Sequence, residues 1–296
     1  MLLSLVKWTI RRATKNSQWQ DIHRVRRGFI RLSKRWNTHS RHCNYLPEVI
    51  SGVPAEWITP KEAHSDTILL YFHGGGYNAG NIDTHRGLVS QIAIAAKLKA
   101  VLIDYRLAPE HPFPAAMNDA VQVYKELLAR GISSKKIAFG GDSAGGGLTL
   151  ATLLFLRDNQ IEMPGCAIVL SPWTDLTLSG PSYQTKQNVE PMLVAAAFPS
   201  WVKNYSGEAD PQNPYISPLF AELNNLPPIH IQVGSEELLL DDSIRFYEKS
   251  IAAGSPVQLQ IFNKYFHVFQ AFYIILPGAR KAIRQLADFL NIHLSK

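Results

Sequence analysis

Short β-type runs of apolar residues alternate with longer segments of helical periodicity over residues 67–296. The candidate strands are residues 67–72, 100–104, 137–140, 167–170, 230–233 and 258–262. Between them, apolar residues recur at i, i+3, i+4 and i+7, as in Ala120, Val123, Tyr124 and Leu127. This alternation is typical of a mainly parallel sheet with helices on both faces. It predicts an α/β fold for most of the chain.

Two segments depart from the alternation. Residues 179–218 combine several prolines with aromatic residues and predict an insertion over one end of the sheet. Residues 1–45 show amphipathic helical patterns and predict an N-terminal basic helical segment that forms part of a lid. We therefore expect an α/β domain built from residues 46–178 and 219–296, a cap insertion at 179–218 and a cap segment at 1–45.

The positive charge of the chain is concentrated at its start. Residues 1–42 hold eleven Lys or Arg and one acid, Asp21, so the formal charge of this segment is +10. The rest of the chain carries −4, which gives the net charge of +6. The basicity is therefore no argument for nucleic-acid binding by the α/β domain. A solvated basic face is the simpler interpretation of the segment, and docking on acidic lipid is the alternative. No apolar run is long enough to predict stable membrane insertion.

The two cysteines, Cys43 and Cys166, are far apart and lack metal-type spacing. They predict a reducing compartment, no disulfide framework and no metal site. The first ten residues, MLLSLVKWTI, have no basic residue ahead of the apolar ones and no small-residue cleavage site. The expected location is the cytoplasm, and no cofactor is expected.

The candidate strand at 137–140 is followed by Gly-Asp-Ser-Ala-Gly at 141–145 and then by an apolar helical run. This is the context of a nucleophile elbow, in which a serine sits on a strained turn between strand and helix. Small residues are needed two positions to either side of Ser143, and Gly141 and Gly145 meet that need. The alternative for such a turn is a glycine-rich loop that only packs the strand on the helix or cradles phosphate.

A second glycine-rich loop, His-Gly-Gly-Gly-Tyr at 73–77, directly follows the strand at 67–72. Loops of this type form the oxyanion hole of lipases and esterases. We expect the backbone amides of Gly75, Gly76 and Ala144 to bind the oxyanion. In folds that combine such an elbow with such a loop, the catalytic residues follow the chain order Ser, acid, His. Because His73 precedes the serine, it is expected to organise the loop rather than to act as the base.

Three histidines follow Ser143, namely His230, His267 and His293. His267 lies in a short loop after the strand at 258–262, where catalytic groups belong, and is the predicted base. The acid should follow the strand at 230–233. Glu236 lies nearest the end of that strand and is the predicted acid, with Glu237 as the rival.

These motifs together resemble the Gly-Asp-Ser-Ala-Gly branch of the bacterial hormone-sensitive-lipase family, which are α/β-hydrolase carboxylesterases. The resemblance spans residues 65–290 and includes Asp-Tyr-Arg-Leu-Ala-Pro-Glu-His-Pro at 104–112 and Ser-Pro-Trp at 171–173. It implies a metal-free Ser-acid-His esterase with a helical lid, acting on small acyl esters. Two departures are Glu where the family's acid is usually Asp, and Val268 where Gly is common after the histidine. The family likeness also implies that Arg106 and Glu110 form buried ion pairs and that chains pair as a homodimer through the last strand.

The predicted function is therefore hydrolysis of small-molecule esters by a serine carboxylesterase, through an acyl-enzyme intermediate. A non-catalytic ligand-binding homologue, an amidase and a lipase on the same triad are the alternatives. A receptor-like homologue that has lost the triad histidine is disfavoured by His267. The residues expected to line the substrate pocket are Tyr77, Leu193, Phe198, Trp201 and Phe266.

Overall fold

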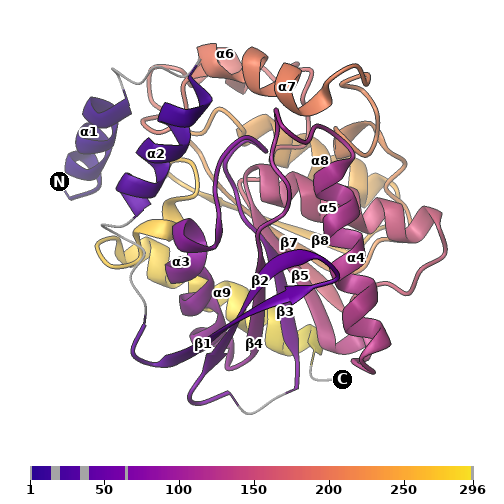
Figure 1. Ribbon diagram of the computed structural model, residues 1–296. Helices are drawn as coiled ribbons and strands as arrows, with labels where there is room; N and C mark the ends of the chain where they lie inside the picture. Colours follow the sequence, from indigo (N-terminus) through magenta and orange to yellow (C-terminus); the bar gives the residue numbers. More distant parts are fainter. Residues whose placement is uncertain (1, 15–20, 34–39, 64–65, 295–296) are drawn as a thin grey trace.

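The computed structural model describes residues 2–14, 21–33, 40–63 and 66–294 (Figure 1). Its centre is a sheet of eight strands in the order β1-β2-β4-β3-β5-β6-β7-β8. The pairs β1–β2 and β2–β4 are antiparallel and the other neighbouring pairs are parallel. The predicted mainly parallel sheet is confirmed. The strands are β1 (Cys43–Ile50), β2 (Val53–Pro60), β3 (Ile68–Phe72), β4 (Lys99–Ile103), β5 (Ile137–Asp142), β6 (Cys166–Leu170), β7 (Ile229–Gly234) and β8 (Val257–Phe262).

The six strands expected from the sequence correspond to β3 to β8, and β1 and β2 were missed. These two form an antiparallel ribbon at one edge of the sheet. Half of the residues of β1 are exposed. β1 contains Pro47, and β2 contains Pro54. Proline inside a run argues against a strand except at a sheet edge, so the sequence pattern gave no strand signal here.

Both faces of the sheet are covered by helices. In β3, Leu70 and Phe72 belong to one hydrophobic core, and Leu69 and Tyr71 belong to the other. Because successive strand residues point to opposite faces, each face of the parallel sheet needs its own apolar layer. Apolar residues of α4 (Ala115–Ala129), α5 (Ala144–Asp158) and α8 (Leu240–Ala252) join the first core, and those of α3 (Ile82–Ala96) and α9 (Pro277–Leu294) join the second.

Short helices gather at one end of the molecule, shown at the top of Figure 1. They are α1 (Leu2–Thr14), α2 (Ile22–Ser33), α6 (Ser182–Thr185) and α7 (Phe198–Ser206). We call these helices, with the residues 186–197 that join α6 to α7, the cap. Short 3₁₀ turns lie at Ser134–Lys136, Ala195–Ala197, Pro218–Phe220 and Phe269–Phe272.

In the N-terminal segment, α1 and α2 are helical as expected, but the helical part does not reach the expected boundary at residue 45, because β1 begins at Cys43. The parts of that expectation at 15–20 and 34–39 lie outside the described residues. Arg26 anchors α2 to the sheet domain. Its guanidinium donates to the carbonyls of Asn78 and Ala108, at 2.7 and 2.8 Å, and pairs with Glu110 at 2.7 Å.

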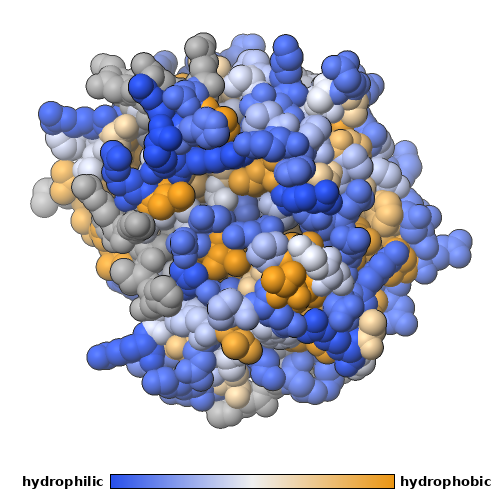
Figure 2. All heavy atoms as spheres, in the orientation of Figure 1, coloured by the Kyte–Doolittle hydropathy of each residue, from blue (hydrophilic) through white to orange (hydrophobic). Residues whose placement is uncertain are grey.

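On the face shown in Figure 2, hydrophobic residues form small separate patches within a hydrophilic surface. None of the helices within the described ranges combines the length and apolar character that crossing a bilayer requires.

Candidate active site

Ser143 lies on the sharp turn between β5 and α5. Its backbone has φ 54° and ψ −122°, an unusual conformation for a residue with a side chain. A Cβ on Gly141 would overlap the carbonyl oxygen of Gly145, and a Cβ on Gly145 would overlap that of Phe72. The two glycines therefore allow the backbone to reverse at Ser143, and the strain places this serine in the manner of a nucleophile elbow.

The glycine loop after β3 faces the same turn. Gly75 and Gly76 have φ values of 125° and 64°, and they line one pocket together with Ser143. Ala144 is the first residue of α5 and follows Ser143 directly. Within the described residues, no turn or loop hydrogen bond uses the amides of Gly75, Gly76 or Ala144 as donors. These amides are available to an anionic oxygen at Ser143.

Asp142 holds the glycine loop in place. One of its carboxylate oxygens accepts from the Tyr71 hydroxyl at 2.9 Å and from the Gly74 amide at 3.2 Å, and the other lies 3.3 Å from His85 Nε2. Burial acts to raise the pKa of Asp142, but the charge and hydrogen bond of His85 and the Tyr71 hydroxyl outweigh it and keep this pKa below its usual range. The carboxylate is thus occupied by structural bonds.

His73 is also structural. Its ring stacks on Tyr105 at a centroid distance of 4.2 Å, and its Nδ1 lies 2.9 Å from the Gly74 carbonyl oxygen. Burial lowers the pKa of His73 to about 3, so the ring is neutral at physiological pH. This geometry matches the expected organising role in the loop.

His267 contacts a carboxylate, but it is not that of Glu236. The Nδ1 atom of His267 lies 3.0 Å from Oε2 of Glu237, and both side chains are buried. Burial by itself lowers the pKa of His267, but the hydrogen bond and charge of Glu237 outweigh burial and leave this pKa above its ordinary value of 6.5. The arrangement is that of an imidazole oriented by an acid through Nδ1.

The expectation that Glu236 orients His267 is therefore wrong. The Glu236 amide donates to the carbonyl of Tyr265, and its carboxylate turns outward to pair with Lys7 of α1. Glu237 turns inward, where its Oε1 accepts from the Ser171 hydroxyl at 2.8 Å and from the Gly234 amide. Neighbouring residues point in different directions, and only the partners supplied by β6, β7 and the His267 loop decide which one faces the imidazole.

A further strained residue follows the histidine. Val268 has φ 47° and ψ 41°, and its amide donates to Ser171 Oγ at 3.2 Å. A left-handed conformation is costly for a β-branched residue and easy for glycine. The backbone conformation thus gives a physical reason for glycine at this position in the family that the chain resembles.

Ser143 and His267 open into one pocket of about 540 Å³, walled by the sheet domain and the cap. Of the five expected lining residues, Leu193 and Trp201 line it. Its apolar wall also includes residues that were not expected, among them Val25, Phe29, Leu88, Met192, Val268, Ala271 and Phe272.

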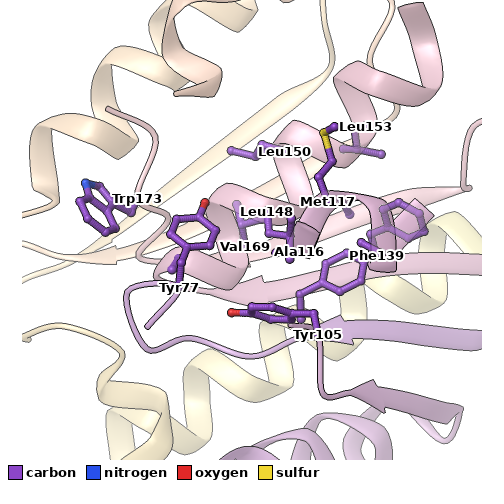
Figure 3. Close-up of a cluster of buried hydrophobic side chains, with 14 of the residues drawn as sticks. Tyr77, Tyr105, Ala116, Met117, Phe139, Leu148, Leu150, Leu153, Val169 and Trp173 are labelled. Atoms are coloured by element: carbon purple, nitrogen blue, oxygen red, sulfur yellow. The ribbon is translucent and has the colours of Figure 1, made fainter. Parts of the chain in front are cut away.

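Three expected lining residues belong to the packed interior instead, and those expectations are wrong. Tyr77 stacks on Tyr205 at a centroid distance of 3.6 Å, and Figure 3 shows it beside Trp173 among buried apolar side chains. Phe198 packs edge-on against Trp173 at 5.1 Å. Phe266 is fully buried against Phe272. Aromatic composition alone does not separate lining from core, because both environments are apolar.

Sequence reasoning also missed Glu190, a buried carboxylate of the cap. It accepts from the backbone amide of His267 at 3.2 Å and from that of Met192 at 2.7 Å. The only signal for it was an acid before Pro191 in an insertion rich in aromatic residues.

The expected ion pairs in the 104–112 motif exist in altered form. Arg106 pairs with the buried Asp119 at 2.7 Å but is itself half-exposed, and Glu110 pairs with Arg26 of α2.

Among the described residues, no group of three His, Cys, Asp or Glu side chains is placed to hold a metal ion. Cys43 and Cys166 are buried free thiols.

Comparisons with known proteins identify the family of the chain. Residues 69–271 match the family model for the alpha/beta hydrolase fold. An acetyl-hydrolase of Streptomyces hygroscopicus is 40% identical over 237 residues, 80% of this chain and 79% of that protein. An esterase of Acinetobacter venetianus is 37% identical over 82% of this chain and 80% of its own length.

Solved structures extend the likeness to almost the whole chain. A crystal structure of an esterase from the bacterial hormone-sensitive lipase family is 38% identical, with a TM-score of 0.95 over 99% of this chain and 98% of the other. An esterase/lipase from an uncultured bacterium is 36% identical, with a TM-score of 0.94 over 100% and 99% of the two chains. The chain therefore belongs to the α/β-hydrolase family and, within it, to the esterases of the bacterial hormone-sensitive-lipase family.

Proposed function

We propose that this protein is a serine carboxylesterase that hydrolyses small acyl esters with a Ser143–His267–Glu237 triad. The observation that carries the proposal is the convergence of three features on one pocket. Ser143 lies there on a strained elbow, His267 is oriented by Glu237, and Gly75 and Gly76 line the same pocket. The relatives named esterase and acetyl-hydrolase support the same activity.

In the proposed mechanism, the hydroxyl oxygen of Ser143 attacks the ester carbonyl carbon while Nε2 of neutral His267 takes the hydroxyl proton. Glu237 keeps the other ring proton on Nδ1 and stabilises the imidazolium. The amides of Gly75, Gly76 and Ala144 bind the oxyanion. The imidazolium then gives its proton to the departing alcohol, which leaves an acyl ester on Ser143.

Water completes the cycle. His267 takes a proton from a water molecule as its oxygen attacks the acyl carbon, and Ser143 regains its proton when the carboxylic acid leaves. The steps use no metal and no cofactor. A pocket of about 540 Å³ is of the size that takes small organic ligands, which favours short or medium acyl chains.

The test is turnover of p-nitrophenyl butyrate by Ser143→Ala. The crystal structure of a similar esterase, 36% identical with a TM-score of 0.94, has been determined after soaking with this ester. We expect Ser143→Ala to lose at least about 10³-fold in kcat. Near-normal turnover by the folded variant would refute the proposal. A matched p-nitroanilide should react far more slowly, and equal rates would favour an amidase.

The finer expectations of location, assembly and organisation remain proposals of the same kind. Buried free thiols at Cys43 and Cys166 are compatible with a cytoplasmic enzyme. β8 is the last strand of the sheet, and an unpaired strand edge supports a homodimer formed through it. We propose that the cap acts as the lid of the pocket, because α2 and the 190–201 region contribute its outer wall.

A further inference from the structure

We propose that Glu190 is a positioning residue of the reaction, whose carboxylate ties the cap to the loop of His267 and whose negative charge stabilises the protonated imidazole. The inference rests on the proposed role of His267 as the base. It concerns a group that is not among the residues lining the pocket and does not touch substrate.

The first observation is the position of the carboxylate. Glu190 is 3% exposed, and its Oε2 accepts from the His267 amide at 3.2 Å. Its Oε1 accepts from the Met192 amide at 2.7 Å, while the next residue, Leu193, lines the pocket with Met192. One side chain therefore sets the distance between a pocket wall and the catalytic loop.

The second observation is that the same cap segment is tied to α1. Arg11 donates to the carbonyl of Asn188 at 2.7 Å, and Thr14 donates to that of Pro191 at 3.0 Å. The cap segment around Glu190 is therefore bonded on one side to α1 and, through the Glu190 carboxylate, on the other side to the loop of His267. A buried carboxylate is an expensive way to make two amide contacts, because its charge must be taken out of water.

The free-energy cost of burying the Glu190 carboxylate is offset if its negative charge stabilises the protonated imidazole of His267. Burial raises the pKa of Glu190 to about 7, and the charge of His267 acts in the opposite direction. The charge of Glu190 in turn contributes to the raised pKa of His267. The two groups therefore titrate as a coupled pair, in which ionisation of Glu190 favours protonation of His267.

Other charges near this pair are accounted for. Glu237 bonds to Nδ1 of the imidazole, and Asp142 adds a more distant negative charge. Among the described cations of the cap, Lys7 pairs with Glu236, Arg11 binds the Asn188 carbonyl, and Arg24, Arg27 and Arg31 line the pocket, while Lys186 is bonded to the Glu190 amide through its carbonyl.

The test is an NMR titration of the His267 ring in the Ser143→Ala background, which needs no turnover and so stays independent of the esterase proposal. A His267→Asn spectrum assigns the signal. Glu190→Gln keeps an oxygen for one of the two amide contacts and removes the charge. We expect it to lower the pKa of His267 by on the order of 0.5 to 1 unit. Glu190→Asp keeps the charge and should leave the His267 pKa near the parent value.

The kinetic counterpart uses the enzyme with Ser143 intact. In Glu190→Gln the acid limb of kcat/KM should move to lower pH, because an imidazole without this charge loses its proton more easily. In Glu190→Asp the limb should stay in place while KM rises, because the shorter side chain pulls Met192 and His267 out of position. Glu208→Gln changes an exposed acid that follows α7 and should change neither quantity.

The parent alone gives a second readout if Glu190→Gln fails to fold. A coupled pair produces a His267 titration curve broader than that of one isolated site. A one-site curve in the parent would overturn the proposal. So would equal His267 pKa values in folded Glu190→Gln and Glu190→Asp, which would reduce Glu190 to a purely structural tether.

Discussion

Replacing Glu237 by Gln should disable the enzyme by changing which nitrogen of His267 carries the proton. The Oε1 atom of Glu237 accepts hydrogen bonds from two donors, the Ser171 hydroxyl and the Gly234 amide. A backbone amide can only donate, so the glutamine oxygen must stay at that position. The glutamine amino group then faces Nδ1 of His267, which must become an acceptor. The ring proton moves to Nε2, and the imidazole can no longer take a proton from Ser143.

The expected loss in kcat follows from the two orientations that the glutamine side chain can take. Turning the glutamine round restores the productive tautomer but leaves the buried Gly234 amide without an acceptor, which costs about 1 to 3 kcal/mol. The imidazolium also loses a bond to a charged group, worth about 1.5 to 3 kcal/mol. Together these figures predict a loss of about 10² to 10⁴ in kcat with little change in KM.

The assay is steady-state hydrolysis of p-nitrophenyl butyrate by Glu237→Gln and by the matched control Glu236→Gln. The control removes the same charge one residue earlier, where the carboxylate pairs with Lys7 on the cap side, and should retain activity close to normal. Thermal unfolding establishes that both variants are folded. A loss of less than tenfold in Glu237→Gln, or an equal loss in Glu236→Gln, would refute the assignment.

Three further outcomes are expected. Gly145→Ala places a Cβ against the Phe72 carbonyl and should cost about 2 to 3 kcal/mol of stability, whereas Gly28→Ala, which meets open space inside α2, should not lower Tm in thermal melts and should raise it slightly. Arg26→Gln removes the anchor of α2 and should raise KM roughly 3- to 10-fold at nearly constant kcat, and an unchanged KM would mean that α2 does not shape the bound state. The rate should rise with pH through a midpoint above 6.5, because the pKa of His267 is raised and only its neutral form accepts the serine proton; a midpoint well below 6.5 would contradict this.

The parallel part of the sheet could be predicted because its strands are buried on both faces. Residues 68–72 and 166–170 are continuous apolar runs flanked by helical patterns, and this signal is local. The edge strand β1 carries no such signal, because half of its residues are exposed to solvent and only its two end residues are buried. The pocket wall was equally hard to predict, since Trp201 and Phe198 belong to one short helix and differ only in what they face.

The sequence by itself determined which serine is the candidate nucleophile and which residues surround it. Gly141 and Gly145 are required wherever the backbone turns this sharply, so the motif and its conformation are inseparable. The chain order of serine, acid and histidine likewise singled out His267. These conclusions depend on neighbours in the chain and on the order of elements, which a sequence contains directly.

Only the tertiary structure decided whether Glu236 or Glu237 contacts the imidazole of His267. It alone also placed the Glu190 carboxylate against the backbone amide of His267. The direction of a side chain in the loop after β7 depends on the Ser171 hydroxyl and the Tyr265 carbonyl, which reach it from distant parts of the chain. Glu190 meets His267 across 77 residues. Contacts of this kind are set by how the elements pack, because burial and hydrogen bonding select one orientation among several that the local sequence allows equally.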